Sequence, residues 1–212
     1  MKTELHIFTN CTKSAPSTLM LRRSHNSFIE TFGKLPVKVW LDPNPKTMAY
    51  KRYRSNLLKN YRNLETTASL SDGYIRAISQ SRSDYLFILE HDWTFNGNIS
   101  HGLDEIIDVM EKYEIYHFRF NKRANVVAKW DRELGEVEHS IIPFCTTPIL
   151  SNNPHIINRK KYLNFLNQGL IKVRPKSYGI EEIISKHPDT WGAIYGGLNY
   201  PATVTHGDGR RG

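Results

Sequence analysis

A run of five residues that are apolar at every position, residues 85–89 (YLFIL), constrains the fold of this chain more than any other segment. Successive side chains of a strand point to opposite faces, so a strand without polar positions must be covered on both faces. Such strands are typical of the middle of a parallel sheet that helices cover on either side. The run therefore predicts an α/β protein, and it leads directly into Glu90-His91-Asp92-Trp93.

Strand and helix patterns alternate through the first half of the chain and give way to mixed pairing in the second half. The predicted strands are residues 5–9, 37–41, 85–89, 115–120 and 202–206, and a hairpin is predicted from 126–129 and 137–142. The predicted helices are residues 16–32, 47–62, a segment capped by Ser71 or Asp72, 103–110, 158–167 and a segment that opens at Gly179. With 212 residues the chain can build one sizeable core. We expect a single three-layer α/β/α domain with a mostly parallel central sheet.

Glu90 and Asp92 follow the central strand two residues apart, so both can project to one side while His91 points to the other. This carboxyl edge is where open α/β sheets bind their ligands. Two carboxylates placed there form an oxygen-rich site suited to Mg²⁺ or Mn²⁺. The alternative is that the two acids merely end the strand and face water.

Three short motifs, taken in order, resemble the GT-A fold of nucleotide-sugar glycosyltransferases of the family 2 type. GT-A enzymes carry an Asp-any-Asp motif after an apolar strand, and Glu90-His91-Asp92 stands at that place with Glu in the first position. They often carry an any-Glu-Asp motif at the start of a later helix, where this chain has Ile180-Glu181-Glu182. Many also have a late metal-binding His, and His206 follows a short predicted strand as that residue does.

The resemblance implies one glycosyltransferase domain over residues 1–212, in which about 1–100 bind the nucleotide sugar and about 101–212 bind the acceptor. It implies that Asp92, Glu90 and His206 hold Mn²⁺ or Mg²⁺ on the donor diphosphate. It also implies that Glu182, or Glu181 in another register, takes the proton of the acceptor hydroxyl as general base. For the two glutamates, the alternative is an acid placed at a helix N-terminus by the helix dipole.

The resemblance also places further residues around the nucleoside diphosphate sugar and the acceptor. The implied donor contacts are Thr9, Asn10, Asp42, His91, Arg210 and Arg211, with Asp208 as a further candidate for the metal or the sugar. Trp93 and Trp191 are planar residues suited to stacking on an acceptor sugar. Each set has a structural alternative: turn chemistry for the strand-end residues, a basic tail for the arginines and core filling for the tryptophans.

The chain is strongly basic, with a formal net charge of +8 and a pI of about 9.4. This bias favours polyanionic partners, and in residues 47–62 Lys and Arg alternate with tyrosines whose rings could stack on bases. A hydroxymethylated DNA base, as in viral DNA-modifying glycosyltransferases, is one acceptor that fits; a surface glycan, a lipid or a protein is the alternative. Two other classes fit the same residues: a metal-dependent nuclease or nucleotidyltransferase, and a non-catalytic nucleic-acid-binding domain.

No apolar run approaches the roughly 20 residues that span a bilayer, and the N-terminal segment lacks the apolar stretch of a signal peptide. We therefore expect a cytoplasmic protein, in the host cytoplasm if it is viral, without stable membrane insertion. The two cysteines, Cys11 and Cys145, are too few for a zinc cluster and are expected to be small buried residues. The sequence leaves the sugar, the stereochemical outcome and the oligomeric state open.

Overall fold

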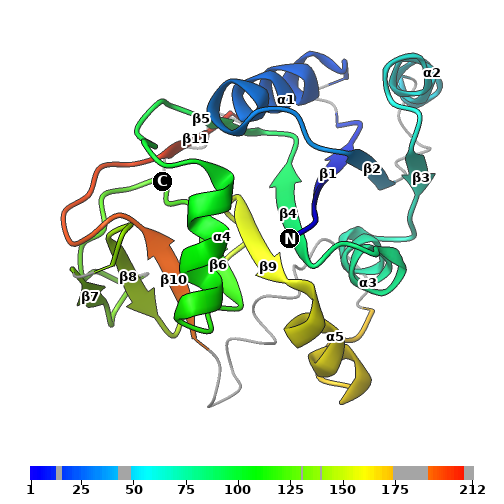
Figure 1. Cartoon of the computed structure of the whole chain (residues 1–212). Coiled ribbons are helices and arrows are strands. Elements are labelled where there is room, and N and C mark those ends of the chain that lie inside the picture. Colours follow the sequence, from blue (N-terminus) through cyan, green and yellow to red (C-terminus); the bar gives the residue numbers. More distant parts are fainter. Residues whose placement is uncertain (13–15, 43–48, 130, 139, 174–190, 208–212) are drawn as a thin grey trace.

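The computed structural model describes residues 1–212 except 13–15, 43–48, 130, 139, 174–190 and 208–212 (Figure 1). The strands are β1 (Thr3–Asn10), β2 (Val37–Asp42), β3 (Leu64–Thr66), β4 (Tyr85–Glu90), β5 (Trp93–Phe95), β6 (His117–Arg119), β7 (Gly135–Val137), β8 (Phe144–Thr147), β9 (His155–Asn158), β10 (Gly192–Tyr195) and β11 (Val204–His206). The helices are α1 (Leu19–Phe32), α2 (Tyr50–Asn60), α3 (Leu70–Gln80), α4 (Leu103–Lys112) and α5 (Arg159–Asn167). Within this part of the chain one mixed sheet has the order β3-β2-β1-β4-β9-β6-β10-β8-β7, and β5 pairs with β11 beside it.

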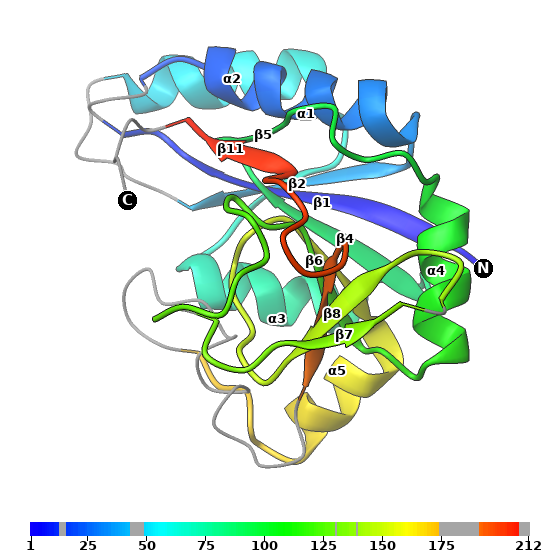
Figure 2. The ribbon, with the colours of Figure 1, turned by 90° about the vertical axis from the view of Figure 1, so that its left-hand side faces the viewer.

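Helices cover both faces of the sheet, and Figure 2 shows α1 and α2 above β1 and β2, with α3 and α5 below them. The central strand β4 sends alternate side chains to two apolar cores. Phe87 and Leu89 join the core formed with α1, α2 and α4, whereas Leu86 and Ile88 join the core formed with α3 and α5. Because both faces are covered, each residue of 85–89 is at most 1% exposed. The predicted buried strand and the three-layer α/β class are confirmed.

The strands β3, β2, β1 and β4 run parallel, so their carboxyl ends meet at one edge of the sheet. In this register Asn10 lies opposite Asp42, and Phe8 lies opposite Glu90. Beyond β4 the sheet is mixed, because β9 runs antiparallel between β4 and β6. The parallel half of the sheet therefore gathers the strand-end residues that the sequence singled out.

Two local predictions are confirmed: the end of α1 at Gly33 and the burial of both cysteines. Helix α1 ends at Gly33, whose φ of +81° suits glycine, and the N–H of Gly33 donates to the carbonyl of Ile29. Cys11 and Cys145 are both buried free thiols. Among the helices of the described residues, none combines the length and apolar character that a membrane crossing requires.

The predicted cap of α3 is wrong by two to three residues. The N-cap is Ser69, whose hydroxyl accepts the backbone N–H of Asp72 at 3.2 Å. Asp72 lies within the first turn and accepts the N–H of Ala68 at 2.9 Å. Ser69 precedes the apolar stripe by one residue, and both Ser69 and Asp72 satisfy free N–H groups at the helix start.

The predicted hairpin of residues 126–129 and 137–142 is also wrong. Strand β7 pairs antiparallel with β8 instead, and near residue 128 the chain forms only an isolated bridge between Ala128 and Asp131. The carboxylate of Asp131 forms a buried ion pair with Arg119 of β6. Asp131 is therefore buried against β6, and the segment before it does not pair with residues 137–142.

Candidate functional site

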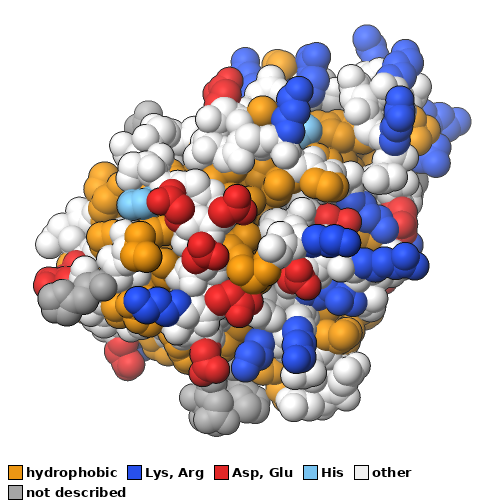
Figure 3. Space-filling view, in the orientation of Figure 1, with side chains coloured by type: hydrophobic (Ala, Val, Ile, Leu, Met, Phe, Trp, Pro, Cys, Tyr) orange, Lys and Arg blue, Asp and Glu red, His pale blue; other side chains and the backbone are white. Residues whose placement is uncertain are grey.

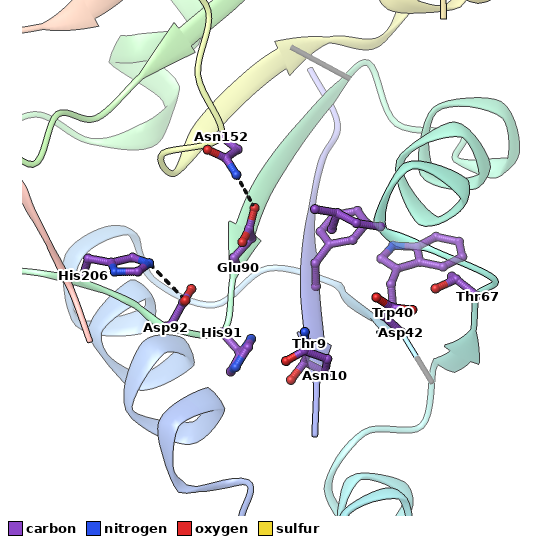
Figure 4. Close-up of a pocket in the computed structure, with 12 residues that line it drawn as sticks. Thr9, Asn10, Trp40, Asp42, Thr67, Glu90, His91, Asp92, Asn152 and His206 are labelled. Carbon is purple, nitrogen blue, oxygen red and sulfur yellow. Dashed lines mark hydrogen bonds and ion pairs between the residues drawn. The ribbon is translucent and has the colours of Figure 1, made fainter. Parts of the chain in front are cut away.

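A pocket of about 320 Å³ opens at the carboxyl ends of β1, β2 and β4 (Figure 4). Its volume lies in the range of roughly 300–1,000 Å³ that is usual for small-molecule sites. The predicted metal ligands line it, together with four of the predicted donor contacts. The lining residues are Phe8, Thr9, Asn10, Trp40, Asp42, Thr67, Leu70, Glu90, His91, Asp92, Asn152 and His206.

The pairing of β5 with β11 brings His206 to Asp92. His206 lies opposite Trp93 in this antiparallel pair, and the N–H of Gly207 donates to the backbone carbonyl of Asp92 at 2.6 Å. The Nε2 atom of His206 is then 3.0 Å from Oδ2 of Asp92. The ring of Trp93 packs edge-on against the imidazole, with 4.5 Å between the ring centroids. Backbone pairing and ring packing therefore both fix the position of the histidine.

Two oxygens of the pocket-lining residues are buried without a hydrogen-bond donor among the described residues. They are Oδ1 of Asp92 and Oδ1 of Asn10. A buried oxygen that lacks a partner loses its hydration, so such atoms are rare unless a bound group satisfies them. Both atoms can therefore accept a contact from a group in the pocket, such as a cation, a water molecule or an N–H or O–H donor of a ligand.

Glu90 is oriented differently from Asp92. Its carboxylate accepts the side-chain N–H of Asn152 at 3.0 Å, and Figure 4 shows it pointing toward Asn152 while Asp92 points toward His206. Figure 4 also shows His91 directed away from that pair, as strand alternation predicts. In the described ranges no group of three or more His, Cys, Asp or Glu side chains lies close enough to hold a metal. The pair of Asp92 and His206 is thus the part of the predicted metal set that the fold assembles directly.

Burial tunes the remaining polar residues of the pocket. It raises the pKa of Asp42, and it lowers the pKa of His91 although the nearby charge of Asp92 opposes that shift. The hydroxyl of Thr9 is hydrogen-bonded to the hydroxyl of Tyr53 from α2. Burial also raises the pKa of Tyr53 to about 12, so this hydroxyl stays protonated. The imidazole of His91 and the hydroxyl of Thr9 are therefore uncharged hydrogen-bonding groups of the pocket, beside the carboxylate of Asp92.

No protein-family model matches the sequence, and no curated protein matches it. Solved structures of TarS from S. aureus do match. The TarS 1–349 structure has a TM-score of 0.56 and 11% identity, over 96% of this chain and 60% of that chain. The same fragment in complex with UDP-GlcNAc has a TM-score of 0.56 and 11% identity, over 100% and 62%. The complex with UDP has a TM-score of 0.56 and 12% identity, over 96% and 60%.

This chain has a GT-A-like fold. At such low identity the likeness to TarS is one of fold alone. The chain spans about three fifths of the length of the TarS 1–349 fragment.

Not every predicted residue lies in the pocket of this GT-A-like domain. Trp93 is 4% exposed, so its ring supports His206 and offers no open face to an acceptor sugar. Trp191 is half-buried, and its backbone N–H donates to the hydroxyl of Tyr116. Five further predictions, for Glu181, Glu182, Asp208, Arg210 and Arg211, lie outside the described residues.

Sequence reasoning missed five of the residues that line the pocket: Phe8, Trp40, Thr67, Leu70 and Asn152. Trp40 precedes Asp42 by two residues, so strand alternation places both side chains on the same face and could have identified the tryptophan. Asn152 lies in a turn-rich segment far from Glu90 in sequence, and no local pattern indicates that the two side chains meet.

Proposed function

We propose that this protein is a glycosyltransferase that moves a sugar from a nucleoside diphosphate sugar to an acceptor hydroxyl group. The observation that carries the proposal is the meeting of Asp92 and His206 beside a pocket at the carboxyl edge of a GT-A-like sheet. TarS, which has a similar fold, was crystallised with UDP-GlcNAc and with UDP. A UDP-sugar is therefore the first donor to test.

The residues beside Asp92 fit a divalent cation, Mn²⁺ or Mg²⁺. Oδ1 of Asp92 is buried without a donor among the described residues, and Oδ2 faces an imidazole nitrogen. Carboxylate oxygen and imidazole nitrogen are both ligands of Mn²⁺. We assign Asp92 and His206 as ligands, and Glu90 would become the third by turning from Asn152 toward the ion. When bound, the ion would stabilise the negative charge of the departing diphosphate.

The chain's own residues have separate tasks in this proposal. Thr9, Asn10 and Asp42 bind the nucleoside at the ends of β1 and β2, where Oδ1 of Asn10, which has no donor among the described residues, can accept a hydrogen bond. His91 lines the same donor pocket. Glu182 takes the proton of the acceptor hydroxyl, with Glu181 as the other candidate. Arg210 and Arg211 neutralise phosphate charge.

The first experiment is calorimetry with a panel of UDP-sugars, with and without Mn²⁺. We expect saturable binding that EDTA abolishes. Lack of binding to every nucleotide sugar would contradict the proposal and favour a non-catalytic binding domain. Cleavage or extension of DNA without any sugar donor would favour a nuclease or nucleotidyltransferase.

Glu182→Gln should retain donor binding and lose turnover; retained turnover would exclude Glu182 as the base.

The charge of the chain favours a polyanionic acceptor, so a hydroxymethylated DNA base is the acceptor to test first, and a surface glycan, lipid or protein is the alternative. Transfer of radiolabelled sugar to DNA that contains hydroxymethylated bases, compared with unmodified DNA of the same sequence, tests this choice. Label on the hydroxymethylated DNA alone supports the DNA acceptor, whereas label on neither DNA contradicts it.

A further inference from the structure

The positive charge of this chain is concentrated in one segment. Residues 16–63 contain ten Lys and Arg but only two Asp and Glu, which gives the segment a formal charge of +8. Elsewhere in the chain, 19 basic residues balance 19 acidic residues. The net charge of the whole protein therefore comes from the segment that forms α1, β2 and α2.

The fold places this charge on one exposed surface. Helices α1 and α2 lie on the same side of the sheet, and His25 of α1 meets the hydroxyl of Tyr61, just after α2, at 3.1 Å. Figure 3 shows Lys and Arg side chains over both helices and Asp and Glu side chains over α4. The α1–α2 basic surface comprises the exposed residues Arg22, Arg23, Lys51, Arg52, Arg54, Lys59 and Arg62.

These cations are available for an external partner. Among the described residues, none of the seven forms an ion pair with an acid, whereas Lys38 and Arg76 both pair with Glu65, and Arg119 pairs with Asp131. Concentrated, unneutralised charge of one sign attracts a partner of the opposite sign. Five of the seven are arginines, whose guanidinium groups bind phosphate in bidentate geometry.

The apolar side chains of this surface decide which polyanion fits best. Tyr53 is 1% exposed and packs into the core, so it cannot stack on bases as the alternation of Tyr with Lys and Arg suggested. Leu19 and Leu58 are the exposed large apolar residues of the described parts of α1 and α2. Membrane-surface helices bury a continuous apolar face with Trp, Phe or Leu, which this surface lacks. It presents charge and little else, as backbone contacts to nucleic acid require.

The spacing of the charges agrees with a phosphodiester chain. From Arg52 to Lys59 helix α2 advances about 10 Å, which equals the rise of about three nucleotides along the axis of a DNA duplex. The same helix reaches the pocket from its buried side, because Tyr53 contacts the pocket residue Thr9. The helix that carries part of the charged surface is therefore in direct contact with the candidate site.

We propose that the α1–α2 basic surface binds the phosphate backbone of a nucleic acid. That this nucleic acid is also the acceptor of the sugar rests on the proposed function. The binding of nucleic acid to the surface does not depend on it. The contacts would be independent of base sequence, because the surface offers cations and no exposed aromatic ring in its described part.

The test is fluorescence anisotropy with a labelled 30-base-pair DNA duplex over a range of salt concentrations. A fourfold variant of the surface is compared with a control that removes four exposed lysines elsewhere. The surface variant carries Arg22→Gln, Arg23→Gln, Arg52→Gln and Arg54→Gln; the control carries Lys2→Gln, Lys160→Gln, Lys161→Gln and Lys172→Gln.

We expect the surface variant to weaken DNA binding about 10-fold or more at 100 mM salt, with a salt slope reduced by about 3. The control should change the affinity less than about twofold, although both variants lose the same charge. The double variant Arg52→Gln with Arg54→Gln provides a milder change if the fourfold variant folds poorly. Equal weakening in both fourfold variants would overturn the assignment to this surface.

Two further measurements distinguish nucleic-acid binding by this surface from membrane binding and from the proposed glycosyltransferase function. Wild-type protein that binds phosphatidylserine vesicles but not the duplex would overturn the nucleic-acid partner. Calorimetry with UDP-sugars should give the same donor affinity in the wild type and in the surface variant. Failure of the wild type to bind any UDP-sugar would contradict the proposed function, whereas the DNA titrations would still decide the role of the surface.

Discussion

The two carboxylate oxygens of Asp92 have different surroundings. One carboxylate oxygen faces His206 at 3.0 Å, while the other is buried without a donor in the described part of the chain. A buried oxygen of this kind costs stability unless a ligand satisfies it. Glu90, two residues earlier, is hydrogen-bonded to Asn152 instead. The two acids of one short motif therefore have different environments.

Asp92→Asn should weaken Mn²⁺-dependent donor binding by about 10- to 100-fold, because an amide is a poorer cation ligand than a carboxylate. Calorimetry with and without Mn²⁺ measures the change. Asp84→Asn is the control, since Asp84 accepts the backbone N–H of Lys2 and lies outside the pocket. Unchanged donor affinity in Asp92→Asn would remove the proposed metal ligand.

Tyr53→Phe should destabilise the protein by about 1 kcal/mol, because the buried hydroxyl of Thr9 loses its partner. Urea denaturation gives the free energy of unfolding. Tyr50→Phe provides the control, as Tyr50 is a half-buried tyrosine of the same helix. Equal losses in the two variants would show that the bond to Thr9 contributes nothing specific. Since Thr9 lines the pocket, Tyr53→Phe should also raise the KM for the donor.

At the scale of elements, the long parallel strands β1, β2 and β4 build most of the site, and one short pairing completes it. The three-residue strands β5 and β11 hold Trp93 and His206 opposite each other and so complete the pocket from the far end of the chain. Helix α3 borders the same pocket, because Thr67 and Leu70 at its start contribute to the lining. The cap of α3 therefore affects both the helix and the pocket.

Ser69→Ala should lower the free energy of unfolding by about 1 kcal/mol, since the N-cap bond to the N–H of Asp72 is lost. Ser79→Ala changes an exposed serine near the other end of α3 and should stay within about 0.5 kcal/mol of the wild type. Chemical denaturation of both variants measures the two free energies of unfolding. A larger loss in Ser79→Ala would show that Ser69 does not cap the helix.

At the scale of the whole molecule, the core between the sheet and α3 and α5 contains neutral histidines. His117 and His155 stack with 4.4 Å between their ring centroids, and both are at most 1% exposed. Their Nδ1 atoms meet the hydroxyl of Tyr162 and the carbonyl of Asn153, each at 2.7 Å. Burial lowers the pKa of His155 to about 4 and that of His117 well below its usual value.

This burial predicts loss of stability in acid. The folded protein keeps both histidines neutral, while the unfolded chain binds protons below about pH 6.5. The contribution of the two histidines to the free energy of unfolding is thus fully present above pH 6.5. It falls as the pH approaches 4, by about 1.4 kcal/mol per pH unit for each histidine. Urea denaturation between pH 7.5 and 4.5 measures the slope. His155→Gln should reduce the dependence of the unfolding free energy on pH by about 1.4 kcal/mol per pH unit, because one histidine no longer takes up a proton on unfolding. An unchanged dependence would show that His155 does not cause the loss of stability in acid.

Local patterns determined much of the fold. The run at residues 85–89, the glycine at position 33 and the apolar stripe of α4 each specify an element, because burial and helix or strand geometry act within a few residues. The same patterns did not give β9, β10 or the pairing of β7 with β8. These strands are short, and only long-range partners stabilise them.

The sequence by itself determined the α/β class, the acidic strand end and the excess of positive charge. Tertiary structure alone decided that His206 reaches Asp92, that Glu90 turns to Asn152 and that the surplus cations share one surface. The residue type fixes the chemistry of a side chain, but its neighbours depend on how distant strands and helices pack to bury apolar area. In this protein the pairing of two three-residue strands, β5 and β11, brings His206 to Asp92.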